Sequence, residues 1–239
     1  EGEEASVLCF TDGNTIVPMI SAQDHKRISD GDMGANTGGM GAYAPAPVMT
    51  KELDKIVYDT ILMPAVKAMK KEGCPFKGCL YAGLMITKDG PKVVEFNCRF
   101  GDPETEAILP LLESDLAKIM LACTKGTLKK EKVEWKNACA VDVVLASEGY
   151  PATHSSGEEI VGLEEAKKTG CLVFHAGSMK KKGRYFVNGG RVLNVAAVAP
   201  TLKEARDKAY EGVSKISWRG MQYRHDIADK GLKRSKKGK

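Results

Sequence analysis

Residues 93–106 constrain the fold of this chain more than any other stretch, because polar and apolar side chains alternate along them until a Gly-Asp-Pro interrupts the pattern. The stretch reads V-V-E-F-N-C-R-F-G-D-P-E-T-E. The turn-forming sequence Lys88-Asp89-Gly90 precedes it, so we predict that residues 93–100 form the second strand of a hairpin whose first strand is 78–87. A short helix is expected after the interruption, at residues 107–112.

The two faces of this predicted strand differ in character, since side chains on a strand point alternately to opposite sides. One face carries Glu95, Asn97 and Arg99, and the other carries Val94, Phe96, Cys98 and Phe100. We expect the apolar face to belong to a hydrophobic core and the polar face to carry chemistry.

The polar face has the donors of a metal and phosphate site. The Glu95 carboxylate and the Asn97 amide carbonyl are hard oxygen ligands, which suit Mg²⁺ or Mn²⁺ shared with the phosphates of a substrate. Arg99 can hold a carboxylate or phosphate through two parallel hydrogen bonds. The alternative is a half-exposed strand whose polar face is only solvated.

The composition favours one large or two ordinary globular domains. Of the 239 residues, 43% are hydrophobic, which is enough for a substantial core. No apolar run is long enough to cross a bilayer and no secretory signal opens the chain, so we expect a cytoplasmic protein without a membrane partner. The first residue is Glu1 rather than Met, which suggests a fragment or a processed chain. The seven Cys are expected to be buried, reduced thiols.

The last ten residues, 230–239, contain six Lys or Arg and no acid, whereas the net charge of the whole chain is only +5. We predict that this basic tail is a solvated, disordered end. Contact with nucleic acid is the alternative, although the tail has no aromatic residue to stack on bases.

Residues 1–128 are predicted to form an α+β layer, in which an antiparallel sheet carries helices on one face. A hairpin is expected from 5–10 and 15–19, and a helix over 50–71 should be capped by Thr50 and kinked at Pro64. The predicted buried stripe of that helix is Leu53, Ile56, Val57, Ile61, Ala65, Val66 and Met69.

A glycine-rich loop at 31–41 follows the first hairpin and matches neither a P-loop nor a dinucleotide-binding motif. Glycines near Asn36 would let backbone N–H groups approach an anion. A purely structural turn is the alternative, but Asp24, Lys26 and Arg27 just upstream favour a binding loop. His25 is expected at the surface.

A polar, Lys-rich linker is predicted at 129–136, followed by a small strand-rich domain at 137–229. Strands are expected at 138–146, 172–175, 184–187 and 191–198, and a helix opens with the capping box Thr201-Leu202-Lys203-Glu204. His175 and Arg191 lie at strand ends beside glycines, which suits phosphate contacts. A partly buried His and a surface Arg are the alternative.

Several motifs together resemble one family, in that family's order. They are E-F-N-C-R-F-G-D-P-E at 95–104, Q-D-H-K-R at 23–27, N-T-G-G-M-G-A-Y at 36–43 and G-G-R-V-L at 189–193. The chain from Glu1 to about Asp229 resembles the phosphoribosylamine–glycine ligases, which belong to the ATP-grasp ligases. The resemblance implies an α+β fold, with the second half of an ATP-grasp module followed by a small strand-rich C-terminal domain.

The resemblance also implies a reaction and a set of roles. Such enzymes use ATP to phosphorylate the carboxylate of glycine, and the amine of 5-phosphoribosylamine then displaces phosphate to form glycinamide ribonucleotide. Glu95 and Asn97 match the ligands of Mg²⁺ or Mn²⁺, and Arg99 is the expected catalytic residue for the anion of glycine or its acyl phosphate. The expected substrate-binding residues are Asp24, Lys26, Asn36, Gly38, Gly39, His175 and Arg191, of which the last two would reach the ribose 5-phosphate.

Two departures from the family pattern limit what we expect of the chain alone. The strand before Glu95 offers no further acidic metal ligand at 82–85, and the family's N-terminal domain and first ATP-grasp half normally precede the stretch that matches Glu1. We therefore expect weak ATP binding and little turnover from these residues by themselves, and the full polypeptide could continue into other purine-pathway domains.

Two other functions remain as alternatives at this stage. One is another ATP-grasp ligase, such as a carboxylase subunit, because E-x-N-x-R with a later Gly-Gly-Arg recurs there. The other is a nucleic-acid-binding module led by the basic tail, which predicts steeply salt-dependent binding. Nothing in the folded part favours a nucleic-acid partner.

Overall fold

The computed structural model describes residues 1–237, and of residues 236 and 237 it describes only the backbone. The chain forms two compact units, each assembled from separate segments. The first contains Glu1–Gln23, Pro45–Gly101 and Leu111–Asn137, and the second contains Asp24–Ala44, Asp102–Pro110 and the chain from Ala138 onward. The division into consecutive domains with a linker at 129–136 stays a prediction.

An antiparallel four-stranded sheet forms the centre of the first unit. Its strands lie in the order β2 (Ile16–Pro18), β1 (Glu3–Thr11), β7 (Gly78–Thr87) and β8 (Gly90–Asn97). Both predicted hairpins are therefore confirmed. Asp12 holds the first turn, since its Oδ1 accepts hydrogen bonds from the N–H groups of Asn14 and Thr15 at 3.0 and 2.7 Å.

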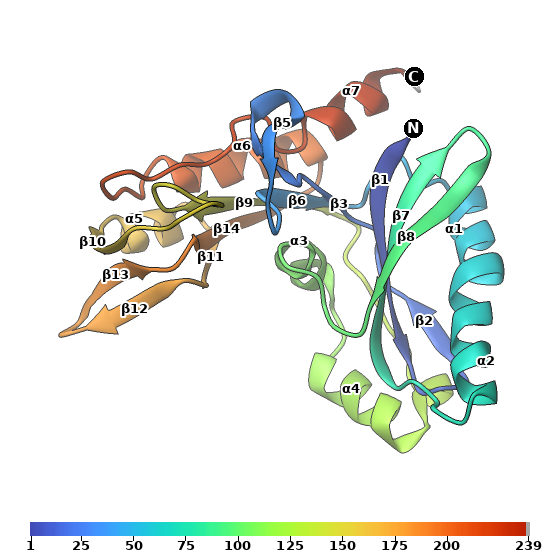
Figure 1. Ribbon diagram of the computed structural model, residues 1–239. Coiled ribbons are helices and arrows are strands. Elements are labelled where there is room, and N and C mark those ends of the chain that lie inside the picture. Colours follow the sequence, from blue (N-terminus) through green and yellow to red (C-terminus); the bar gives the residue numbers. More distant parts are fainter. Residues whose placement is uncertain (238–239) are drawn as a thin grey trace. The chain divides into compact units, whose positions relative to one another are not determined.

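The long helix of the first unit covers one face of this sheet (Figure 1). It consists of α1 (Lys51–Val57), a π-helical segment (Tyr58–Leu62) and α2 (Met63–Lys71). The hydroxyl of Thr50 caps its start, as predicted. A kink was expected at Pro64. The structure has a π-helical segment just before this residue, in which the regular i→i−4 backbone hydrogen bonds are already interrupted.

The helix buries a narrower stripe than predicted. Val57, Ile61 and Val66 pack against β1 and β7, and each fully buried aliphatic side chain contributes roughly 1.5 to 3 kcal/mol. Ile56 and Met69, however, are 43% and 40% exposed. The prediction for these two residues is wrong. Met69 follows the π-helical turn, which changes the angular spacing on which an ideal helical stripe depends, whereas Ile56 precedes that turn in α1, where only Val57 is buried.

The apolar face predicted for residues 93–100 is also corrected. β8 ends at Asn97, and a bulge leaves Val94 without an opposite residue, so the regular alternation stops. Val94 and Phe96 are 65% and 45% exposed, and Cys98 is exposed as well. β8 is an edge strand, and the core of the unit lies around β1 and β7 instead.

The segment after β8 supplies helices to both units. α3 (Glu104–Ile108) starts earlier and ends sooner than the predicted helix at 107–112, and single 3-10 turns follow at Leu109–Leu111 and Leu128–Lys130. In the first unit α4 (Leu116–Lys125) packs against β1 and β7. The carboxylate of Asp115 caps α4 by accepting a hydrogen bond from the N–H of Lys118.

A five-stranded sheet forms the core of the second unit, in the order β11 (Leu172–His175), β14 (Arg191–Ala199), β9 (Cys139–Ala146), β6 (Gly41–Ala44) and β3 (Gln23–Asp24). Helix α6 (Leu202–Val213) packs on β9 and β14 and begins with the predicted capping box. Its predicted stripe is buried, namely Leu202, Ala205, Ala209, Val213 and Ile216.

Smaller elements surround this sheet. A three-stranded sheet has the order β10 (Ser156–Ile160), β13 (Arg184–Asn188) and β12 (Ser178–Lys181). The short strands β4 (Arg27–Ser29) and β5 (Met33–Asn36) form a hairpin, and α5 (Leu163–Lys168) lies between β10 and β11 in the chain. Sequence patterns predicted neither β10 nor β12 nor α5, because their residues are mostly exposed and polar.

The predicted disordered tail is a helix, α7 (Asp229–Lys237), as far as it is described; residues 238 and 239 lie outside the described residues. Contacts with the rest of the second unit order this segment despite its polar composition. Leu232 packs against the core of the second unit, and Lys230 forms an ion pair with Asp32. Gly231 allows the helix to approach the ring of Tyr43 closely.

All seven Cys are free thiols, but they are not all buried as expected: Cys74 and Cys98 are exposed, and Cys139 is half-buried. Within residues 1–237, no helix is both long and apolar enough to cross a membrane.

Candidate functional site

Glu95 and Asn97 lie side by side at the end of β8 in the first unit. Nδ2 of Asn97 donates a hydrogen bond to Oε1 of Glu95 at 3.0 Å, so the two side chains share one face. Arg99 lies beyond the strand, and its Nη1 donates to the Phe100 carbonyl at 2.9 Å. The predicted alignment of Arg99 with the strand face is therefore wrong, because the chain bends after Asn97.

No group of three or more His, Cys, Asp or Glu within residues 1–237 is placed to hold a metal ion. Glu95 and Asn97 nevertheless offer two oxygen donors on one exposed face. This donor set fits a hard divalent cation that takes its remaining ligands from phosphates and water, rather than a cage made by the protein.

The glycine-rich loop of the second unit does not present the cradle of amide groups that its sequence suggested. The N–H groups from Thr37 to Met40 all donate within the protein: to the Lys26 carbonyl, the Tyr150 hydroxyl, the Thr37 hydroxyl and the His25 carbonyl, respectively. The loop offers carbonyl oxygens to Arg191 instead. Asn36, at the end of β5, is exposed.

Arg191 lies at the start of β14, and its guanidinium contacts both the glycine-rich loop and Asp102. Its Nη1 donates to the carbonyls of Gly38 and Asp102, at 2.9 Å each, and lies 2.9 Å from Oδ1 of the Asp102 carboxylate. A Cβ on Gly38 would lie 3.0 Å from the guanidinium carbon, so glycine permits this close approach. Within residues 1–237, Nε and Nη2 of Arg191 make no hydrogen bond, which leaves two donors for an anion.

Asp24 and Lys26 form an ion pair at the edge of the same cluster, with Nζ of Lys26 and Oδ2 of Asp24 3.0 Å apart. Burial, together with the carboxylate of Glu104, raises the pKa of Asp24 to about 7. Glu104 is itself buried at the start of α3. Asp24 is therefore a group that changes charge near neutral pH, although Lys26 opposes the shift.

Four acidic residues of this cluster were not assigned to a site from the sequence: Asp102, Glu104, Glu106 and Asp142. Burial raises the pKa of Glu106 to about 7, and the Asp102 carboxylate adds to the shift. Asp142 is fully buried in β9, and burial, with Glu106 and Asp102 nearby, raises its pKa well above the ordinary value. The one signal for Asp142 in the sequence is an acid in the middle of an apolar strand, A-C-A-V-D-V-V-L-A.

His25, which was expected at the surface, and His175, which was expected to bind substrate, have different surroundings. His25 is 1% exposed rather than at the surface, and burial, together with the positive charge of Arg224, lowers its pKa to about 4. His175 lies opposite Leu193 of β14. Its Nδ1 is 2.8 Å from the Ser178 hydroxyl and its ring stacks on Tyr185, with centroids 4.4 Å apart. His25 is therefore a neutral core residue.

Replacing Gly39 by alanine should lower the free energy of unfolding by about 2 kcal/mol more than Gly183→Ala does. Gly39 has φ +114°, and a Cβ there would lie 2.3 Å from Cδ of Pro103 and 2.7 Å from Oδ1 of Asp24. Gly183 is the matched control, with φ +81° and no atom within 4 Å of the added Cβ. Urea denaturation of both variants measures the difference, and equal losses would contradict the packing of Gly39 against Pro103.

The buried acids should make the second unit less stable as the pH rises. An acid whose pKa is raised by folding stabilises the fold fully below its unfolded pKa, near 4, and loses that contribution as the pH rises through its folded pKa. For Asp24 and Glu106, whose folded pKa is about 7, this stabilising contribution is lost as the pH rises to about 7. Because burial also raises the pKa of Asp142, Asp142→Asn should make the fall in stability above about pH 4 shallower and stabilise the protein by about 1 to 2 kcal/mol at alkaline pH.

Denaturant unfolding at several pH values tests this expectation. Asp207→Asn, which removes a half-exposed acid on α6, is the control and should leave the pH dependence unchanged. If Asp142→Asn and Asp207→Asn follow the same pH profile as the unsubstituted protein, Asp142 is not protonated in the folded state.

Comparison with known proteins assigns both parts of the chain to one family. Residues 1–105 match the ATP-grasp (A) domain of phosphoribosylglycinamide synthetase, and residues 140–230 match the C domain of the same enzyme. The chain belongs to the phosphoribosylglycinamide synthetase family. The family and the ATP-grasp fold predicted from the motifs are thereby confirmed.

Individual relatives of this synthetase family are similar over nearly the whole chain. The chain is 54% identical to the trifunctional purine biosynthetic protein adenosine-3 of Gallus gallus, over 97% of its own length and 23% of that protein. It is 51% identical to the chloroplastic phosphoribosylamine–glycine ligase of Arabidopsis thaliana, over 98% of its length and 45% of that protein. It thus spans about half the length, or less, of these relatives.

A solved structure of the family has the same fold. The crystal structure of phosphoribosylamine–glycine ligase from Thermotoga maritima aligns with a TM-score of 0.85 and 38% sequence identity. The alignment covers 95% of this chain and 56% of that protein. The mixed α+β architecture with antiparallel sheets is therefore that of the synthetase family.

Proposed function

We propose that the complete protein containing this chain ligates glycine to 5-phosphoribosylamine, using ATP, and forms glycinamide ribonucleotide, ADP and phosphate in purine biosynthesis. The observation that carries the proposal is the 51% identity, over 98% of the chain, to a protein named phosphoribosylamine–glycine ligase. The geometry is compatible with it, since each unit brings together polar side chains suited to anionic substrates.

In the proposed reaction an oxygen of the glycine carboxylate attacks the γ-phosphorus of ATP, and ADP leaves. The amine of phosphoribosylamine then attacks the carbonyl carbon of glycyl phosphate, and phosphate leaves with that carboxylate oxygen. A Mg²⁺ or Mn²⁺ ion, held by Glu95 and Asn97, would neutralise phosphate charge. Arg99 is proposed to hold the carboxylate, which becomes the acyl phosphate, in place for the two attacks.

In the second unit, Arg191 is the proposed anchor for the 5-phosphate, because Nε and Nη2 remain available while Nη1 fixes the guanidinium. Asp24, Lys26, Gly38 and Gly39 are proposed to form the wall beside the phosphoribosylamine. Asn36 and His175 remain proposed substrate contacts; His175 would have to exchange its present partner, Ser178.

Location and further domains are also proposals. A cytoplasmic location would suit a purine biosynthetic enzyme, although the Arabidopsis relative is named chloroplastic. The similarity to a trifunctional protein favours the presence of other purine-pathway domains in the full polypeptide.

The proposal is tested with the complete protein, ATP and glycine whose carboxylate is labelled with a heavy oxygen isotope. We expect glycinamide ribonucleotide to form only when phosphoribosylamine is present, and one labelled oxygen to appear in the released phosphate. An assay with bicarbonate and a biotinyl carrier is the control for a carboxylase. Turnover with bicarbonate but not with glycine, or unlabelled phosphate beside a labelled product, would overturn the proposed reaction.

A further inference from the structure

The outward side of the three-stranded sheet in the second unit carries an aromatic and basic surface that the proposed ligase reaction does not use. β13 turns Tyr185 and Val187 toward the core, where Val187 is fully buried. Because side chains alternate along a strand, Arg184 and Phe186 take the opposite side. We call the side chains of Met179, Lys181, Lys182, Arg184 and Phe186 the hairpin face.

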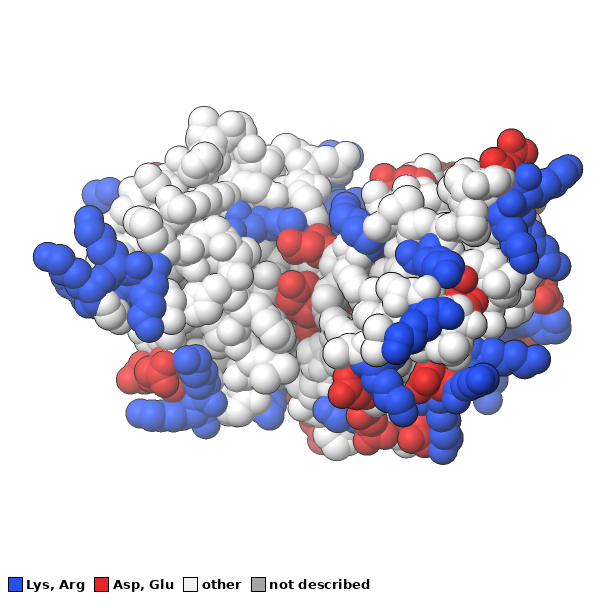
Figure 2. Space-filling view, turned by 90° about the horizontal axis from the view of Figure 1, so that it is seen from below, with Lys and Arg blue, Asp and Glu red and all other residues white. Residues whose placement is uncertain are grey.

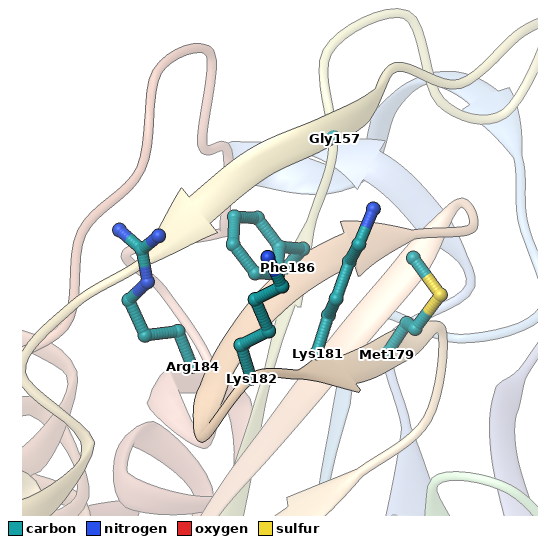
Figure 3. Close-up of a pocket in the computed structure, with 6 residues that line it drawn as sticks. All are labelled: Gly157, Met179, Lys181, Lys182, Arg184 and Phe186. Carbon is teal, nitrogen blue, oxygen red and sulfur yellow. The ribbon is translucent and has the colours of Figure 1, made fainter.

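The hairpin face is arranged by the register of β12 and β13. Met179 lies directly opposite Phe186, and Lys181 lies opposite Arg184. Figure 3 shows these side chains extending from the hairpin toward the same space, with Gly157 of β10 across from them. The pocket that they line with Gly157 has a volume of about 330 Å³, which is at the lower end of the range for small-ligand pockets.

Gly157 borders open space at the β10 side of this pocket. It has φ +95°, and no atom lies within 4 Å of the position that a Cβ would occupy. The ring of Phe186 is half-buried, and the guanidinium of Arg184 lies over it, 5.8 Å from its centroid. A flat ligand placed in the pocket would therefore meet an aromatic ring, a thioether and a planar cation.

Charge is unevenly distributed around the pocket. Lys181 and Lys182 are exposed at the turn end of the hairpin, and Figure 2 shows basic side chains gathered over this part of the second unit. At the β10 side, Glu159 pairs with Arg184 at 2.9 Å, and Glu158 lies next to it. An anionic group is therefore attracted to the lysine end and repelled from the β10 end.

We propose that the hairpin face binds a nucleotide unit, with the base on Phe186 and Met179 and the phosphate on Lys181 and Lys182. Stacking on an aromatic side chain beside a track of cations is how proteins bind unpaired nucleotides without reading their sequence. Glu158 and Glu159 fix the orientation, since they disfavour phosphate at the opposite end. A free nucleoside monophosphate and one nucleotide of a single strand share this chemistry.

The test uses the chain as it stands and measures binding of fluorescently labelled adenosine monophosphate and of a single-stranded oligoadenylate about eight nucleotides long. Phe186→Leu removes the aromatic ring but keeps an apolar side chain. Lys181→Gln with Lys182→Gln removes the proposed phosphate contacts. The matched control is Lys168→Gln with Lys215→Gln, two exposed lysines of the same unit. Inorganic pyrophosphate serves as an anion without a base.

We expect Phe186→Leu and the Lys181/Lys182 variant each to weaken binding of both nucleotide probes about tenfold. For the oligonucleotide, the Lys181/Lys182 variant should also reduce the slope of log K against log salt by about 0.7 for each lost phosphate contact. The control variant should bind like the unsubstituted chain. Pyrophosphate binding should not respond to Phe186→Leu.

Two results would overturn the proposal. One is binding that the control variant weakens as much as the Lys181/Lys182 variant, which would indicate general attraction to a basic chain. The other is binding of adenosine monophosphate that neither hairpin variant changes, which would place the nucleotide elsewhere. Tighter binding of the oligonucleotide than of the mononucleotide would identify a single strand as the source, and equal affinities would identify a free nucleotide.

Discussion

Replacement of Arg224 by alanine should lower the free energy of unfolding of the second unit by about 4 kcal/mol. The side chain is fully buried, and its guanidinium makes four hydrogen bonds. Nε and Nη2 hold both oxygens of Asp226 at 2.7 Å, while Nη1 donates to the Arg27 carbonyl and to Asp32 at 3.0 Å each. Alanine leaves these acceptors without their donor and opens a cavity where the buried guanidinium lay.

The measurement is urea denaturation followed by the fluorescence of Trp218, which is buried in the core of the same unit. Trp135→Phe in both proteins removes the only other tryptophan. Arg219→Ala is the matched control, because Arg219 is exposed and its nearest acid, Glu158, is 3.6 Å away; it should cost less than about 0.5 kcal/mol. A loss for Arg224→Ala as small as that for Arg219→Ala would show that the buried guanidinium stabilises little.

The loss for Arg224→Ala should shrink in acid. Hydrogen bonds from Arg224 and from the Gly31 N–H lower the pKa of Asp226 and outweigh the opposite effect of its burial. A lowered pKa contributes stability that is present above the unfolded pKa, near 4, and is lost as the pH falls through the folded value. The stabilities of the variant and the unsubstituted protein should therefore begin to converge below about pH 4 and approach each other further as the pH falls through the lowered pKa of Asp226.

Replacement of Arg191 by alanine in the complete protein should lower kcat/KM for phosphoribosylamine by about 100-fold or more. Arg191 presents two free donors beside Gly38 and Asp102, so its loss removes the proposed 5-phosphate contact and releases the glycine loop. Because the lost contact is with one substrate, the KM for phosphoribosylamine should rise far more than the KM for ATP.

Steady-state kinetics with each substrate varied in turn measures this effect. Arg191→Lys keeps the charge but loses the planar fork of donors, and it should recover only part of the activity. Thermal unfolding of both variants separates a binding defect from a folding defect. An unchanged KM for phosphoribosylamine in folded Arg191→Ala would show that another residue holds the phosphate.

The sequence predicted the parts of the fold that depend on neighbouring residues. The apolar strands β1 and β7, the cap Thr50 and the capping box at Thr201 all follow from local chemistry that a short window contains. The core assignment of Val94 and Phe96 was wrong because period-two alternation does not reveal a bulge or which strand lies at the edge of a sheet.

The candidate site was predictable only in part, for a related reason. Arg191, Gly38 and Asp24 carried recognisable motif chemistry, whereas the significance of Asp142 depends on acids that approach it from distant segments, such as Glu106. Likewise, the basic composition of 229–237 indicates disorder until the apolar contact of Leu232 is known. The protonation of Asp142 and the helical order of 229–237 both depend on residues that are distant in sequence but close in space. A local sequence pattern does not reveal such contacts.

The discontinuous construction of the second unit has a consequence for the order in which it forms. β6 pairs with β9, almost a hundred residues later in the chain, and the β4–β5 hairpin is tied to Arg224 through contacts about two hundred residues apart in sequence. Such contacts close long loops and form slowly. During synthesis, the glycine-rich loop and its acidic neighbours therefore wait until the segment around Arg224 has emerged, so the proposed phosphate-binding side of the second unit forms later than the first unit's hairpins.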